Sequence, residues 1–170
     1  MACYVGANVS VDTLPYRPLP ITRETHMQIV LRFRVPNSEA HYAGNLVSGS
    51  KLMEYFGDAA TELLIRLDGD EGLFRAYEKV DFLAPVNGGD FLEISAKIVH
   101  VGSSSRKMEF AAYKVIRPRP DVHASSADAL DEPILVAQAI GTCVVPKGFQ
   151  RRTHPPDLLA KGAANASHSL

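Results

Sequence analysis

The chain has 170 residues, of which 46% are hydrophobic and 22% charged, which suffices for one domain with its own core and excludes disorder along most of its length. With 18 Lys and Arg residues against 19 Asp and Glu residues the net charge is −1, and this excludes the strongly basic surface of a general nucleic-acid binder. No apolar stretch is long enough to span a membrane, and no secretory signal opens the chain, so we expect a cytoplasmic protein without membrane contact.

The first predicted elements are an arm, a strand and a helix. Residues 1–25 contain several prolines and no steady hydrophobic period, which predicts an irregular N-terminal arm. Residues 26–35 alternate between apolar and polar side chains, as in a half-buried strand. From residue 48 to residue 67, apolar side chains recur at helical spacing over a wide arc. This pattern predicts one long, largely buried helix that ends at the turn beginning with Asp68.

Four strand-like runs follow the helix. They cover residues 73–83, 91–101, 106–117 and 133–145. The segments 87–90 and 102–105 consist of Asn, Gly, Asp and Ser residues, which favour tight turns between strands. The polar segment 118–132 is predicted to be a longer, mobile loop, and residues 147–170, rich in Pro, Ala, His and Ser, a flexible C-terminal tail.

This order of elements predicts an α+β fold. A single buried helix beside an antiparallel sheet has to be covered on most of its sides, so we expect a curved antiparallel sheet wrapped around one long central helix. That layout is the hotdog fold, which here spans residues 26–146. Hotdog domains usually pair through the edges of their sheets, and the order of the strands is not visible in the sequence.

Four segments of the chain resemble one family of CoA enzymes. The segments are HYAGNLVSG (41–49), GDAATELL (57–64), LDGDEGLFRAYEKVDFLAPV (67–86) and GTCVVP (141–146). They resemble the hotdog-fold ammonia-lyases of 3-aminoacyl-CoA thioesters, in particular the 3-aminobutyryl-CoA ammonia-lyase family of lysine fermentation, with the β-alanyl-CoA ammonia-lyases as neighbours. The resemblance spans residues 28–150, so it leaves out both ends of the chain.

The resemblance implies a carbon–nitrogen lyase that reversibly eliminates ammonia from 3-aminobutyryl-CoA to give crotonyl-CoA. Such an enzyme acts on an acyl-CoA and ammonia as a homodimer or a larger homo-oligomer. It needs no metal and no organic cofactor, because coenzyme A is part of the substrate. The chemistry requires a stabiliser for an enolate-like oxygen, a base for the α-carbon and an acid for the departing amine.

The stabiliser is predicted at the start of the helix. Backbone N–H groups there have no partner within the helix and carry a partial positive charge. Val47, Ser48 and Gly49 lie at this point, and Gly49 leaves room for the thioester oxygen, so the three are predicted to bind substrate. The alternative is that Ser48 is an ordinary N-cap and Gly49 merely packs.

Asp58 and Glu62 are predicted to be the acid and the base. Their i,i+4 spacing puts both carboxylates on one face of the helix, away from the apolar arc. If this face meets a second subunit, two neighbouring carboxylates raise the pKa of one of them, which then serves as the acid while the other serves as the base. Both fall on the family motif, and Glu54 does not. The alternative is a solvated face with surface ion pairs.

Three residues before the helix complete the predicted substrate site. Histidine side chains in general change charge near neutral pH and suit the handling of an amine, so His41 is predicted to be catalytic. Tyr42 and Asn45 are predicted to bind substrate, with Asn45 either orienting the substrate or fixing the loop. A loop histidine that bonds the backbone is the alternative reading of His41.

The phosphates of coenzyme A are predicted to bind at the turn that follows the second strand after the helix. Ser104, Ser105, Arg106 and Lys107 form a small basic turn rich in hydroxyls, whose backbone N–H groups and cations suit phosphate oxygens. An ordinary charged hairpin is the alternative. The histidines show no ligand spacing for a metal, and Cys143 in an apolar run is not predicted to be a nucleophile.

Two rival functions remain open from the sequence. An acyl-CoA thioesterase on the same fold would use one carboxylate to activate water and the helix start to hold the carbonyl, and fold alone does not separate it from a lyase. A non-catalytic acyl-CoA-binding protein is less favoured, because a regulator of that kind should carry an additional recognition domain. The complete His-Tyr and Asp-Glu motifs favour the lyase.

Overall fold

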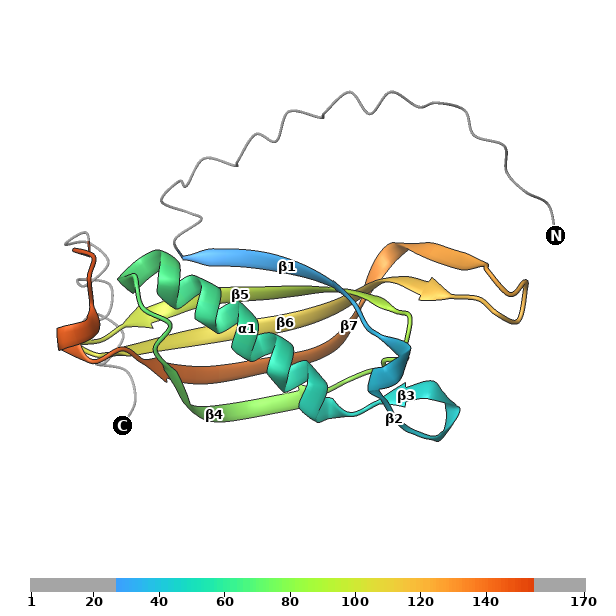
Figure 1. Ribbon diagram of the computed structural model, residues 1–170, viewed down its shortest axis with the longest axis horizontal. Helices are drawn as coiled ribbons and strands as arrows, with labels where there is room; N and C mark the ends of the chain where they lie inside the picture. The colour runs from blue at the N-terminus through green and yellow to red at the C-terminus, as the bar shows by residue number, and fades with distance from the viewer. Residues whose placement is uncertain (1–26, 155–170) are drawn as a thin grey trace, which may run out of the picture.

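The computed structural model describes residues 27–154 and shows one antiparallel sheet with a long helix lying across it (Figure 1). The five strands follow the spatial order β1-β5-β6-β7-β4, so β1 and β4 form the edges. Their bounds are β1 Gln28–Arg34, β4 Leu73–Phe82, β5 Phe91–Val101, β6 Ser105–Pro118 and β7 Ala127–Val144. The predicted strands therefore exist, and the structure adds their order.

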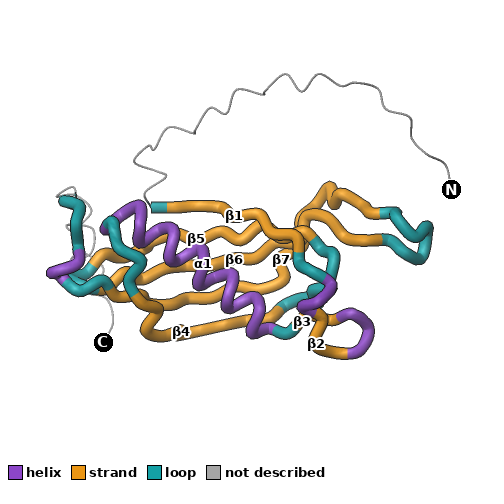
Figure 2. The backbone as a smooth tube through the Cα atoms, viewed as in Figure 1, coloured by secondary structure: helices purple, strands orange, loops and turns teal. Residues whose placement is uncertain are grey.

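The chain between β1 and the helix forms a small subdomain at one end of the sheet (Figure 2). It comprises the 3₁₀ turns η2 (Asn37–Glu39) and η3 (Ala43–Asn45) and the two-stranded pair β2 (Ala40–Tyr42) and β3 (Leu46–Val47). Gly44 and Asn45 both have positive φ, 73° and 63°, which Gly adopts freely and Asn tolerates better than most residues. This tight reversal sets His41 and Tyr42 directly before the helix.

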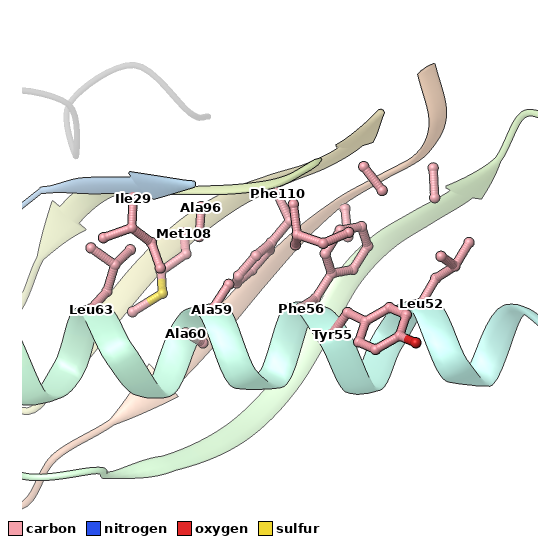
Figure 3. Packing of buried hydrophobic residues seen from close by; sticks show 14 of the residues in the cluster. Ile29, Leu52, Tyr55, Phe56, Ala59, Ala60, Leu63, Ala96, Met108 and Phe110 are labelled. Carbon is pink, nitrogen blue, oxygen red and sulfur yellow. The ribbon is translucent and has the colours of Figure 1, made fainter. Parts of the chain in front are cut away.

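The helix α1 spans Gly49–Asp68, close to its predicted bounds. It ends because Gly69 takes the left-handed conformation, with φ 76°, and its N–H donates to Ile65 O at 3.0 Å. Its apolar stripe packs on the sheet, and Figure 3 shows Phe56 and Leu63 directed at Phe110 and Met108. Fully burying a side chain of this size contributes ~1.5–3 kcal/mol, so the stripe fixes α1 on the sheet.

The sheet covers the apolar stripe of α1, as the hotdog layout predicts, and the opposite face of the helix is exposed. Glu54, Asp58 and Ile65 are exposed along the outer face of the helix, and Ile65 is 40% exposed. The physical reason is that a single five-stranded sheet meets one stripe of a straight helix. The outer face of α1 is therefore open in a single chain.

Segment 118–132 is not the predicted mobile loop. Strands β6 and β7 continue into a hairpin that projects from one end of the sheet (Figure 1), with Pro118 opposite Ala127. Arg119 binds Asp128 at 2.7 Å and Asp121 at 2.9 Å across its tip. Polar cross-strand pairs stabilise this hairpin. Its sequence therefore lacks the alternation of apolar and polar residues from which the other strands were predicted.

The flexible tail was predicted to begin at residue 147, but the first residues of this segment form a turn and contact the helix. Residues 147–154 form the 3₁₀ turn η4 (Lys147–Phe149) and then cross the C-terminal end of α1. Arg151 N–H donates to Asp68 O at 2.8 Å, and Arg152 Nη1 donates to Arg66 O at 2.7 Å. These donors satisfy carbonyls that a helix end leaves without partners. The predicted arm, residues 1–25, and the rest of the tail, residues 155–170, lie outside the described residues.

Candidate functional site

The start of α1 is open rather than capped. Ser48 stands at the N-cap position, but its side chain makes no capping hydrogen bond. Its Oγ instead makes a short contact with Ser50 Oγ. In the first turn, Lys51 N–H donates to Ser48 O at 3.1 Å. The N–H groups of Gly49 and Ser50 precede the first helical hydrogen bonds, so this end offers donors and a partial positive charge to an oxygen brought close to it.

An apolar hollow of about 660 Å³ opens at this helix start. Its lining comes from β3, the first turns of α1 and the segment after β4: Tyr42, Leu46, Val47, Ser48, Gly49, Ser50, Leu52, Met53, Phe82, Leu83, Ala84, Pro85 and Val86. A volume of this size falls in the range of small-molecule sites, which are largely apolar with a few placed polar groups. Four of the five predicted substrate-binding residues, all except Asn45, line it.

A side chain at position 49 would meet Phe82, a neighbour that was not predicted. A Cβ added at Gly49 would lie 2.6 Å from the Phe82 ring, well inside van der Waals contact. Phe82 is 53% exposed, so the ring has room to move aside. The absence of a side chain at position 49 thus allows an aromatic ring to stand over the helix start, where the thioester oxygen was predicted to approach.

Asn45 and Val47 contribute to the framework of the loops. Asn45 Nδ2 donates to Gly88 O at 2.9 Å, which is the loop-fixing role considered from the sequence. Val47 N–H donates to Val86 O at 2.9 Å, so this N–H is not available to a substrate and Val47 is a wall residue rather than a donor. The donors that remain are those of the helix turn itself.

A second, polar hollow of about 320 Å³ also adjoins the helix start and is lined in part by His41. It shares Ser48 and Ser50 with the apolar hollow. Lys51 crosses it with ion pairs to Glu39 at 3.1 Å and Glu54 at 2.8 Å. Lys51 Nζ donates hydrogen bonds to the carboxylates of Glu54 and Glu39, which hold the pKa of Lys51 above its ordinary value, so Lys51 is a cation at neutral pH.

His41 and Tyr42 point to different sides of this end of the molecule. The Tyr42 ring is 54% exposed and lines the apolar hollow. The His41 ring packs edge-on against it, with 4.7 Å between the centroids, and is also exposed. Tyr42 thus lines one of the two hollows at the helix start and His41 lines the other.

The predicted acid and base lie away from both hollows of the same chain. Within residues 27–154, neither Asp58 nor Glu62 lines them. Glu62 follows Gly49 by thirteen residues, which is about 20 Å along a helix axis. Glu62 accepts hydrogen bonds from Arg66 Nε at 2.8 Å and Nη2 at 2.5 Å, and Asp58 is exposed. One chain alone does not bring these carboxylates to the helix start.

The prediction that Arg106 binds phosphate is wrong. Arg106 is 0% exposed, and its guanidinium binds the equally buried Asp68 through Nη2 at 2.6 Å and Nε at 3.0 Å. Its Nη1 donates to the carbonyls of Gly102 and Ser105 at 2.9 Å. Side chains of β6 alternate between the two faces of the sheet, and Arg106 lies two residues before Met108. Both therefore point to the inward face, where Arg106 is buried.

The rest of the predicted CoA turn is accessible but remote. Ser104 and Ser105 are half-buried, and Lys107 pairs with Glu78 at 2.7 Å on the surface. The turn adjoins the C-terminal end of α1 through the Arg106–Asp68 pair. It lies at the opposite end of a 20-residue helix from the apolar hollow, about 30 Å away along the axis.

Two buried groups that titrate have no place in the chemistry. Burial raises the pKa of the Cys143 thiol to about 12, and burial likewise raises the pKa of Tyr77 to about 12. Cys143 is therefore a neutral thiol at physiological pH, as expected for a residue that is not a nucleophile. Tyr77 Oη donates to Met53 O at 3.1 Å and ties β4 to the first half of α1.

No helix in residues 27–154 is long and apolar enough to cross a membrane. The same residues contain no group of three or more His, Cys, Asp or Glu side chains arranged to hold a metal ion.

Known proteins resemble the chain in sequence and in fold. A family model described as the Thioesterase superfamily matches residues 44–116. The 3-aminobutyryl-CoA ammonia lyase of Acetoanaerobium sticklandii is 53% identical over 126 residues, which are 74% of this chain and 100% of that protein. The solved β-alanyl-CoA:ammonia lyase of Clostridium propionicum is 33% identical with a TM-score of 0.71, covering 79% of this chain and 95% of its own.

A more distant structure shares the fold alone. The hexameric hotdog fold thioesterase of Campylobacter jejuni is 22% identical with a TM-score of 0.60, covering 78% of this chain and 94% of its own. The antiparallel sheet with one long helix and these neighbours confirm the hotdog fold predicted from the order of the elements.

Proposed function

Since the chain belongs to the family of the 3-aminobutyryl-CoA ammonia lyases, we propose that it catalyses the reversible elimination of ammonia from 3-aminobutyryl-CoA to give crotonyl-CoA. The observation that carries the proposal is 53% identity over the whole length of a lyase with that name. The family membership itself confirms the resemblance found in the sequence, and the enzyme class is a CoA-thioester ammonia lyase.

The open start of α1 supports a role as the oxyanion stabiliser. Removal of the α-proton moves charge onto the thioester oxygen, and donors already aimed at that oxygen stabilise the transition state by about 3 kcal/mol each. The N–H groups of the first helical turn at Gly49 and Ser50 face the apolar hollow, where both residues are part of the lining. The acyl chain and the thioester then occupy the apolar part of the hollow, against Leu52 and Met53.

The carboxylates come from a second copy of the chain in this proposal. Strand β4 is an unpaired edge with exposed apolar residues, Leu73 at 72% and Phe82 at 53%, and such edges pair with other chains unless they are covered. Strand β4 runs back along α1, so that Phe82 lies at Gly49 and Gly72 lies against Leu64. An antiparallel pairing of two β4 strands about a two-fold axis therefore sets the second half of one helix beside the first half of the other.

This arrangement resolves the distance of about 20 Å between Glu62 and the helix start within one chain. The partner's Glu62 and Asp58 approach the hollow from across the axis, and there they serve as base and acid for the α-proton and the amine. His41 in the adjoining polar hollow is proposed to assist the departure of the amine, and Tyr42 to contact the substrate. The protein is accordingly a homodimer or a larger homo-oligomer.

The same axis supports a binding site for the CoA phosphates. In the proposed dimer, the turn of Ser104, Ser105 and Lys107 in the partner chain lies beside the apolar hollow of this chain. Lys107 is 41% exposed in its ion pair with Glu78, and exposed pairs of this kind are weak enough to exchange for a phosphate. Arg106 has no part in this site, because its guanidinium is buried.

The test is to mix the purified protein with crotonyl-CoA and ammonium, and to follow the enoyl-thioester absorbance and the free thiol separately. A lyase consumes the enoyl thioester only when ammonium is present and releases no thiol. Thiol release that needs no ammonium would instead identify a thioesterase, which the same helix start could serve. If neither signal changes, the proposed substrate is wrong.

A further inference from the structure

A buried ion pair lies behind the wall of the apolar hollow. Lys114 of β6 is 8% exposed and Asp90, next to β5, is 1% exposed. Lys114 Nζ lies 2.8 Å from Asp90 Oδ2. Buried charges are unfavourable unless they are paired and hydrogen-bonded, and the chemistry proposed above uses neither residue.

Both members of the pair also form hydrogen bonds with the loop of residues 84–90, and Asp90 is the last residue of this loop. Lys114 Nζ donates to Pro85 O at 2.9 Å. Asp90 Oδ2 accepts a hydrogen bond from Asn87 N–H at 2.8 Å. The pair thus holds this loop near its beginning and at its end, and the loop cannot move as a body while both contacts persist.

The same loop is the wall of the hollow. Pro85 and Val86 line it, and Val86 O accepts the Val47 N–H at 2.9 Å directly before the helix start. Gly88 and Asn45 exchange two hydrogen bonds, at 3.1 Å and 2.9 Å. A continuous set of contacts therefore runs from Lys114 through the loop to the first turn of α1.

The packing around the loop leaves no slack for a different conformation. A Cβ added at Gly88 would lie 2.8 Å from Asn37 Cα and 2.8 Å from Asn45 Oδ1. The backbone of the loop is thus in direct contact with η2 and η3. A displacement at Pro85 is transmitted to the hollow rather than absorbed behind it.

We propose that the Lys114–Asp90 pair positions the wall of the apolar hollow and thereby sets the affinity for the acyl-CoA thioester. The proposal rests on the proposed function, because it takes the hollow as the thioester site. Lys114 is a positioning residue, since it acts through Pro85 and touches no reacting atom. Contacts of the wall with the acyl chain are the same in the ground state and in the transition state, so loosening the wall raises KM and leaves kcat nearly unchanged.

The test replaces both members of the pair, so that no buried charge is left alone. Lys114→Met with Asp90→Asn removes the donor to Pro85 O but keeps an acceptor for Asn87 N–H. The matched control is Arg106→Met with Asp68→Asn, which removes a fully buried ion pair at the far end of α1. KM and Kd for crotonyl-CoA, kcat with ammonium, and amide hydrogen exchange are measured for both variants.

The proposal predicts that the Lys114 double variant raises KM and Kd for crotonyl-CoA about tenfold, with kcat within about twofold of the wild type. Exchange at the Val47 amide, which reports the bond to Val86 O, becomes faster in this variant without ligand. The Arg106 double variant changes neither quantity. Unchanged KM, Kd and Val47 exchange in a folded Lys114 double variant would overturn the proposal.

The measurements separate this proposal from the proposed function. If the wild type binds crotonyl-CoA without turning it over with ammonium, the lyase activity is contradicted, and the change in Kd still decides the role of the pair. If the wild type does not bind crotonyl-CoA, the thioester site is contradicted together with the affinity claim. Equal effects of the two double variants would show a general loss of stability and would also contradict the positioning role.

Discussion

The two ends of α1 differ in how their polar groups are satisfied. At the C-terminal end, Gly69 closes the helix, Arg106 pairs with the buried Asp68, and Arg151 donates to the Asp68 and Gly69 carbonyls. At the N-terminal end, the Ser48 side chain makes no cap and two hollows adjoin the first turn. The closed end contributes to stability, and the open end is left able to bind a ligand.

The comparison also separates two uses of charge. Around Asp68, charges are buried and paired, and His154 Nε2 lies 2.7 Å from Asp68 Oδ1 as well. Around the open end, the carboxylates of Glu39 and Glu54 are exposed and pair with Lys51. Buried pairs cost much when one member is lost, whereas exposed pairs cost little. Mutations at the C-terminal end should therefore lower the free energy of unfolding, and mutations at the N-terminal end should change the kinetics of the reaction.

The largest effect is expected at the closed end, from Arg106→Met alone. The substitution leaves Asp68 without its guanidinium in a site that is 0% exposed, which should lower the free energy of unfolding by about 3–5 kcal/mol. Urea denaturation measures it, and turnover per folded molecule should persist. A loss below about 1 kcal/mol would mean that the pair behaves like a surface pair and that the closed end is not what stabilises the helix.

The next effect is expected from Glu62→Gln. Because Glu62 is the proposed base or acid, its replacement should lower kcat by about 10²–10⁴-fold. The Kd for crotonyl-CoA should stay close to that of the wild type. Its ion pair with Arg66 is an i,i+4 pair that is 33% exposed, so little stability is lost. Glu54→Gln on the same face is the control and should retain activity. Wild-type turnover by the Glu62 variant would remove it from the mechanism.

A smaller effect, of about 1 kcal/mol in stability, is expected from Gly49→Ala at the open end, because the exposed Phe82 ring can move aside. The new Cβ meets the Phe82 ring, which has to move. Phe82→Ala should relieve this clash, so a double-mutant cycle should show a coupling of at least about 0.5 kcal/mol between the two sites. Additive effects of the two substitutions would show that the ring does not press on the helix start.

The last effect is absent at neutral pH and concerns Cys143, which pairs with Arg106 in the sheet at the closed end. The pKa of the thiol rises from 9.0 in the unfolded chain to about 12 on burial, so the folded state keeps the proton up to a higher pH than the unfolded state. The resulting stability is fully present below pH 9 and is lost as the pH rises towards 12. Stability measured between these pH values should fall less steeply in Cys143→Ala than in the wild type, and identical slopes would refute the burial of the thiol.

The helix and the central strands could be predicted because their side chains follow a single period. Leu52, Phe56, Leu63 and Leu67 mark one stripe of α1, and all are buried. Alternation along β6 also placed Arg106 and Lys114 on the inward face with Met108 and Phe110. That signal was present, but the cationic side chain of Arg106 suggested phosphate binding because its partner, Asp68, lies 38 residues away in the sequence.

The parts of the site that depend on distant pairs could not be predicted. The ring of Phe82 stands over Gly49 only because β4 turns back along the helix, and Lys114 reaches Pro85 only through the order of the strands. The i,i+4 spacing of Asp58 and Glu62 was sufficient to put them on one face. It could not show that the helix start lies about 20 Å from Glu62 in the same chain.

The central claim, that the open helix start of one chain works with the carboxylates of another, is tested most directly by mixing two inactive variants. One chain carries Gly49→Val, which obstructs the helix start, and the other carries Glu62→Gln. When the two chains are co-expressed with different tags and the mixed dimers are purified through both tags, each two-fold heterodimer has one of its two sites intact, so about half of the wild-type ammonium-dependent activity should return. A mixture as inactive as its parents would show that each site is built within one chain, and would contradict this account.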